Sequence, residues 1–67
     1  MTPDERLEEL RSELPMYVWS KITEDMECAQ TCETLEDFRA NLKEAMASCD
    51  TLRDELKMVL VMAGGTP

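Results

Sequence analysis

The side chains in this 67-residue chain that could both bind a metal and take part in redox chemistry are three cysteine thiols. A closed structural zinc site needs four ligands, and the chain has no histidine to add to Cys28, Cys32 and Cys49. Cys28 and Cys32 stand four residues apart, so a redox pair would require the last helical turn to unwind. We therefore expect no metal and no cofactor. We expect free cysteines buried in a helical core, with a disulfide between Cys28 and Cys49 as the alternative.

Catalysis would need a group that transfers protons near neutral pH or an activated nucleophile. The chain has no histidine, and no serine lies in a strained glycine-flanked turn. Neighbouring acids such as Asp54 and Glu55 point in different directions on a helix, so they do not form a carboxylate pair. We predict no catalytic residues and no enzymatic activity.

Four large side chains in succession, Met16, Tyr17, Val18 and Trp19, have the composition of a protein-binding surface. Consecutive helical residues cannot all face one core, so some of these side chains must be exposed or at an interface. Tryptophan and tyrosine are common binding anchors, and methionine adapts to irregular surfaces. Packing of Trp19 in the core is the alternative, whereas Tyr17 is expected outside. We take Met16, Tyr17 and Trp19 as candidate partner-binding residues.

An acidic stretch without any base lies between Ile22 and Phe38. Its acids are Glu24, Asp25, Glu27, Glu33, Glu36 and Asp37. A negative tip could dock on a basic groove or steer association, and Glu24, Asp25 and Glu27 are candidates for that contact. The alternative is a solvated turn whose acids favour the N-terminus of the next helix.

The overall charge limits the partners of the chain. Fifteen acidic and seven basic residues give a net charge of −8, which repels nucleic-acid backbones and argues against direct nucleic-acid binding. Mimicry of a nucleic acid is an alternative that Arg39, Lys43, Arg53 and Lys57 weaken by diluting the negative charge. The sequence has no secretory signal and no apolar run near the ~20 residues of a membrane span, so we expect a cytoplasmic protein with no membrane contact.

Helix signals divide the chain into three segments. Thr2 and Glu5 are typical of a helix N-terminus, and Pro15 predicts a kink or break at about residues 12–15. The second segment is expected to place one apolar face inward, formed by Met16, Trp19, Ile22, Met26 and Ala29. A tight turn at about residues 30–34 follows, with Thr34 as the next N-cap.

The third segment has the clearest pattern, a strict alternation of three- and four-residue spacing. Its seam residues are Leu35, Phe38, Leu42, Ala45, Cys49, Leu52, Leu56, Val59 and Ala63. This period predicts a long helix over about residues 35–63 with a left-handed coiled-coil seam, ended by Gly64 and Gly65. We predict an all-α fold in a single domain, residues 1–67: an antiparallel helical hairpin with a proline-kinked N-terminal arm.

The end of the third segment is apolar on every side, including Leu60, Val61 and Met62. A helix that is apolar all round must be enclosed all round, and a 67-residue hairpin has too few residues to enclose it. We therefore expect the hairpin to pair as a homodimeric bundle, with the seam as its core. The alternative is a monomer whose Leu60, Val61 and Met62 bind the partner directly, so these three are candidate partner-binding residues.

In outline the pattern is similar to small plasmid and phage regulators, although the basic faces of the plasmid RNA-binding hairpin dimer are missing here. It more closely resembles small phage-encoded helical inhibitors of host regulators or motor ATPases. This similarity concerns architecture and assigns no residue a role. We predict an acidic regulator that binds a larger host protein, of the phage or mobile-element type, as an inhibitor or anti-activator. The alternatives are a nucleic-acid-mimicking anti-defence protein and a structural assembly subunit with no foreign partner.

Overall fold

The computed structural model describes residues 2–65 and contains three helices in this part of the chain. They are α1 (Pro3–Ser12), α2 (Met16–Thr31) and α3 (Leu35–Met62), and no strand occurs between residues 2 and 65. The prediction of an all-helical chain with a long last helix is therefore confirmed. The break between α1 and α2 also falls where Pro15, which has no backbone N–H, was expected to end the first helix.

Local capping sets the helix boundaries. The Thr2 hydroxyl accepts from the Glu5 amide at 3.2 Å, and the Thr34 hydroxyl accepts from the Asp37 amide at 3.1 Å. Each bond satisfies one of the amides that a helix start leaves without a partner. After α3, Gly64 has φ of +87°, a left-handed conformation that glycine adopts without strain.

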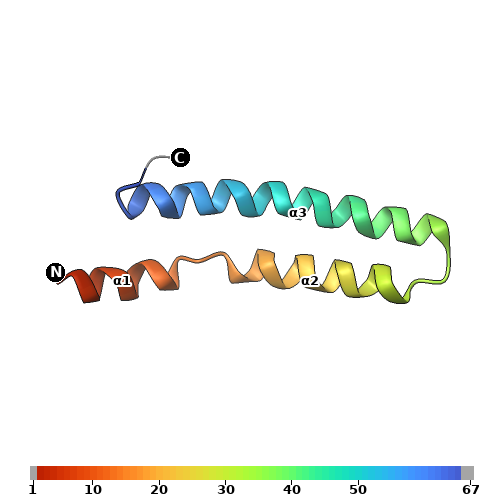
Figure 1. Ribbon diagram of the computed structural model, residues 1–67, viewed down its shortest axis with the longest axis horizontal. Coiled ribbons are helices and arrows are strands. Elements are labelled where there is room, and N and C mark those ends of the chain that lie inside the picture. Colours follow the sequence, from red (N-terminus) through yellow and green to blue (C-terminus); the bar gives the residue numbers. More distant parts are fainter. Residues whose placement is uncertain (1, 66–67) are drawn as a thin grey trace.

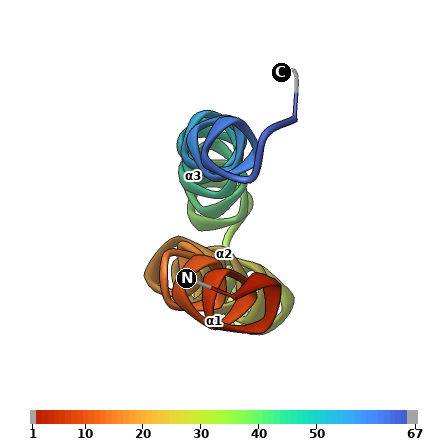
Figure 2. The same ribbon diagram turned by 90° about the vertical axis from the view of Figure 1, so that its left-hand side faces the viewer.

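The molecule is an elongated rod with dimensions of 52 × 19 × 10 Å. In Figure 1, α2 and α3 lie side by side and run in opposite directions. The end-on view in Figure 2 shows α1 and α2 overlapping on one side and α3 alone on the other. α1 has no buried residue, and its described link to α3 is a hydrogen bond from the Arg6 guanidinium to the Met62 carbonyl. Among residues 2–65 the extensive packing is that of α2 on α3.

Branched apolar and small side chains form the contact between α2 and α3. Val18, Ile22 and Ala29 are buried on α2, and Ala45 and Ser48 are buried on α3. Small residues at a crossing let two helix backbones approach closely. No side chain within residues 2–65 is completely enclosed, so the core is thin for a folded unit.

The face of α3 that packs on α2 is rotated from the predicted seam. It runs through Asn41, Ala45, Ser48, Leu52, Glu55 and Val59, all buried or half-buried. Of the seam residues, only Ala45, Leu52 and Val59 belong to this face. The others of the described helix, Leu35, Phe38, Leu42, Cys49 and Leu56, are exposed. The apolar arc of α3 is wider than one neighbouring helix can cover, and α2 covers the side that carries the small residues.

The same rotation corrects two further expectations. Met16, Trp19 and Met26 were predicted to face inward on α2, but all three are exposed, because Val18 rather than Trp19 faces α3. The prediction of buried cysteines is also wrong, since the free thiols of Cys28 and Cys49 are exposed. In both cases the packed face carries smaller residues than the sequence pattern indicated.

Candidate protein-binding surfaces

The most extensive exposed apolar surface combines side chains from α2 and α3. We call it the seam face, and it consists of Trp19, Met26, Leu35, Phe38, Leu42, Cys49, Leu56 and Leu60. Trp19, the only tryptophan, keeps 54% of its surface exposed. Partly exposed aromatic and aliphatic side chains in this number are typical of a surface that another protein covers.

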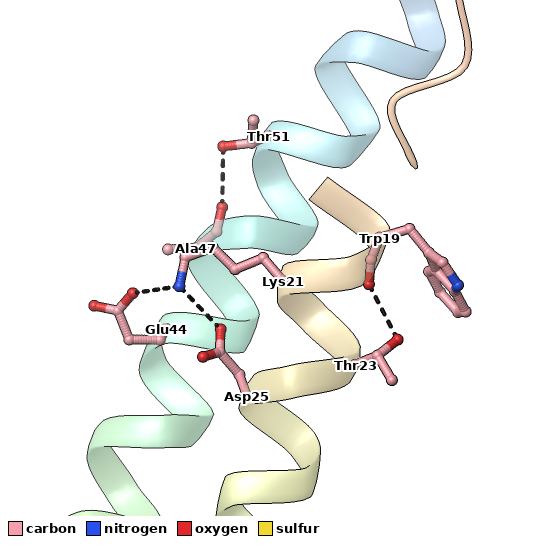
Figure 3. A network of polar contacts seen from close by, with 7 residues as sticks. All are labelled: Trp19, Lys21, Thr23, Asp25, Glu44, Ala47 and Thr51. Carbon is pink, nitrogen blue, oxygen red and sulfur yellow. Dashed lines mark hydrogen bonds and ion pairs between the residues drawn. The ribbon is translucent and has the colours of Figure 1, made fainter. Parts of the chain in front are cut away.

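Polar contacts mark the opposite edge of the α2–α3 pair. Lys21 Nζ lies 3.4 Å from Asp25 Oδ2 and 3.4 Å from Glu44 Oε2, and the Tyr17 hydroxyl donates to Glu55 Oε1 at 3.3 Å. In Figure 3, Trp19 points away from the group formed by Lys21, Asp25 and Glu44. The pair therefore has a polar edge, where the Lys21–Glu44 and Tyr17–Glu55 contacts cross between the helices.

The spacing of residues puts the seam face on one side of the rod. Successive helical residues turn by about 100°, so Trp19 and Met26 lie across α2 from Lys21. By the same turn, Leu42 and Cys49 lie across α3 from Glu44. Because Lys21 and Glu44 meet at the polar edge, the apolar residues of both helices share the other side.

Two shallow grooves hollow the seam face. One, of about 490 Å³, is lined by Cys49, Leu52, Arg53, Leu56, Lys57 and Leu60. The other, on α2, is lined by Trp19, Thr23, Met26, Glu27 and Gln30. Each groove has an apolar floor, and its charged rim is basic on α3 and acidic on α2. This pairing of apolar floors with charged rims suits recognition of a protein surface.

A second apolar surface lies at the end of α3, on the other side of Lys57 from the seam face. We call it the tail patch: Tyr17, Met58, Val61 and Met62. Met58, Val61 and Met62 line one groove with Lys57, and Tyr17 reaches this end of α3 through its bond to Glu55. The tyrosine is 69% exposed, as expected for it. The structure thus divides the predicted tail residues, with Leu60 on the seam face and Val61 and Met62 in the tail patch.

The acidic stretch between Ile22 and Phe38, which we call the acidic tip, has fewer acids available for binding a partner than its composition indicates. The Asp25 side chain is only 13% exposed and forms an ion pair with Lys21. Glu36 and Asp37 lie in the first turn of α3, where acids favour the helix N-terminus. Glu24 and Glu27 are exposed. Of the three candidate acids, these two are free to meet another molecule, whereas Asp25 is already paired with Lys21 on its own helix.

Two side chains on the polar edge, Tyr17 and Lys21, have a raised pKa. The neighbouring Glu55 carboxylate raises the pKa of Tyr17 above 10.0, because its negative charge disfavours the phenolate form of the tyrosine. The Asp25 carboxylate, helped by Glu44, raises the pKa of Lys21 above 10.5, because both favour the ammonium form. Both groups keep their ordinary protonation state near neutral pH.

The described residues show no arrangement for metal binding: no group of three ligating side chains converges within residues 2–65. Cys28, Cys32 and Cys49 are free thiols, so the alternative disulfide between Cys28 and Cys49 is absent. None of the helices in the described chain is long and apolar enough to cross a membrane.

Sequence reasoning missed Ser48 and Glu55 as contributors to the α2–α3 contact. Both follow the same three- and four-residue spacing as Ala45 and Leu52, but a search for apolar periodicity passes over polar residues. A search for small residues at helical spacing would have found Ser48. The link from Tyr17 to Glu55 joins residues 38 positions apart and has no local signal.

Comparison with known proteins gives no relative from which a role could be transferred. No protein-family model, no curated protein and no solved structure matches the chain.

Proposed function

We propose that this chain is a non-enzymatic regulator that binds a larger protein and acts as an inhibitor or anti-activator. In this proposal α2 and α3 form a persistent helical hairpin, which pairs with a second copy and presents the tail patch to the foreign partner. The seam face and the tail patch are distinct, so one chain can make both contacts.

The observation that carries the proposal is the amount of surface left uncovered. The chain exposes 5435 Å², whereas a compact protein of 7.7 kDa exposes about 4300 Å². Part of the excess is apolar and aromatic, on the seam face and in the tail patch. Burial of such surface contributes about 25 cal/mol per Å², so covering it stabilises the chain and its complex together.

The tail patch has the features of an anchor for a foreign protein. Tyr17 is a large amphipathic side chain held in place by Glu55, and Met58 and Met62 are flexible apolar neighbours. A tyrosine fixed at one end loses little rotational freedom on binding. Regulation then follows from occlusion or from holding the partner in one conformation, neither of which needs a catalytic group.

Affinity capture from a lysate of the source cells tests this function. The tagged chain is expected to retain a defined protein, and Tyr17→Glu and Met62→Glu should each reduce that retention at least about tenfold, the effect of losing one binding anchor. Thr51→Glu is the matched control, because Thr51 is exposed outside the tail patch. Retention should survive high salt, since the contact is apolar.

The outcomes separate the alternatives. If no protein is retained, or if all three variants retain it equally, the tail patch is not a binding site for a foreign partner. If high salt alone abolishes retention, the acidic tip carries the contact and the nucleic-acid-mimic function replaces the one proposed here.

A further inference from the structure

We propose that a second copy of this chain covers the seam face, in a two-fold pairing whose axis runs along the rod. α2 of each copy then lies over α3 of the other copy, and both α2–α3 turns lie at the same end of the dimer. This inference rests on the pairing in the proposed function and adds the face, the orientation and the register.

The uncovered surface matches what a stable dimer needs. The chain exposes about 1100 Å² more than a compact protein of its mass. A standard protein–protein interface buries about 800 Å² on each partner. A self-complementary contact over the seam face, which extends along α3 from Leu35 to Leu60, would account for most of this excess.

The charges flanking the seam face select the orientation. The outer flank of α3 carries three bases, Arg39, Arg53 and Lys57, and one acid, Asp50, so it is basic on balance, whereas the outer flank of α2 carries Glu27 among uncharged residues. An axis across the rod would lay α3 on α3 of the second copy and bring these bases together. An axis along the rod instead lays the basic flank of α3 against the acidic flank of α2, and opposite charges favour that pairing.

The register follows from the contacts between α2 and α3. The Lys21–Glu44 and Tyr17–Glu55 contacts place Glu27 level with the stretch from Phe38 to Ala45, which includes Arg39. A two-fold axis along the rod leaves each residue at the same position along the rod in both copies, so Glu27 meets Arg39 of the second copy. Within residues 2–65, neither Glu27 nor Arg39 forms an ion pair in its own chain, which leaves both charges for the second copy.

The acidic tips do not oppose this orientation, although they lie at the same end of the dimer. Asp25 is neutralised by Lys21 on the polar edge. By their spacing, Glu24 and Glu36 lie on the outer sides of their helices, away from the seam face. Most of the negative charge of each tip therefore points away from the other copy.

Disulfide mapping tests the orientation in a chain with Cys28→Ser and Cys32→Ser. With Cys49→Ser, Thr23→Cys and Met46→Cys added, oxidation should give a dimer in which peptide mapping links position 23 of one copy to position 46 of the other. Both positions are exposed on the outer flanks of the seam face, too far apart within one chain to be joined there. With Cys49 as the only thiol, oxidation should give no dimer.

A charge exchange tests the register independently. Glu27→Lys and Arg39→Glu should each weaken pairing about tenfold in sedimentation equilibrium, and the double variant should restore it to within about threefold of the wild-type constant. Helix content measured by circular dichroism must stay unchanged in each variant, which excludes loss of the fold.

Each result decides the proposal. A dimer linked by Cys49 to Cys49 would show an axis across the rod and overturn the orientation, as would a double variant no better than the single ones. A chain that stays monomeric while still retaining a foreign protein would overturn the pairing with a second copy and leave only the binding of a foreign protein standing. A chain that still pairs with a second copy but retains no foreign protein would overturn the binding of a foreign protein and leave the pairing standing.

Discussion

At the scale of single residues, the polar edge depends on two side chains that join α2 to α3. Lys21 bridges Asp25 and Glu44, and Tyr17 bonds Glu55. Both lie at the surface, where an ion pair contributes little free energy. They mark which sides of the two helices meet, and therefore which side is left as the seam face.

Because Tyr17 is the only tyrosine, its titration can be read directly from the absorbance of the phenolate. We expect its pKa to lie above 10.0 in the folded chain, and Glu55→Gln to lower it by removing the repelling charge. Asp54→Asn is the matched control. An unchanged titration in the Glu55→Gln variant would show that the two side chains are not in contact.

The same shifts fix the pH dependence of stability. Tyr17 and Lys21 both have a folded-state pKa above the ordinary value, so the folded state holds their protons more tightly than the unfolded chain. Their contribution is complete below pH 10.0 and is lost as the pH rises through the folded-state pKa values. The free energy of unfolding should therefore fall above pH 10.0, and less steeply in Tyr17→Phe.

Residue-scale features were predictable from the sequence where they are local. The caps at Thr2 and Thr34 depend on residues three positions away, and both are present. The exposure of Tyr17 was also predicted. The covered state of Asp25 could not be foreseen, because its environment includes Lys21, which in turn reaches Glu44 on another helix.

At the scale of helices, the main feature is which face of α3 packs on α2. Apolar residues cover an arc of α3 wide enough to contact two neighbouring helices. From the sequence pattern alone, the larger apolar residues are expected to form the contact with α2. The structure places Ala45 and Ser48 against α2 instead. Helix boundaries were predictable from proline, glycine and capping residues, whereas the face was decided by the fit between two helices.

A matched pair of alanine substitutions tests this choice. Ala45→Leu should destabilise the chain by about 1–3 kcal/mol, because Ala45 is buried against α2 and a larger side chain overpacks the contact. Ala47→Leu, at an exposed position two residues later, should change stability by less than about 0.5 kcal/mol. Thermal unfolding at a fixed chain concentration measures both. Equal effects would contradict the described packing face.

At the scale of the whole molecule, the chain is extended rather than compact. Its radius of gyration is 15.8 Å, whereas a compact domain of 67 residues has about 11 Å. A single layer of α2 on α3 leaves every large apolar side chain of the seam face partly exposed. A second layer of helices would supply the missing side of the core, as in a four-helix bundle.

Sedimentation equilibrium of the purified chain tests most directly whether the seam face is covered by protein. We expect a mass of twice 7.7 kDa that falls toward 7.7 kDa only on strong dilution. Phe38→Glu, near the start of α3 on the seam face, should shift the chain to the monomer at all concentrations. A wild-type chain that sediments at 7.7 kDa throughout, with its helix content intact, would contradict the account.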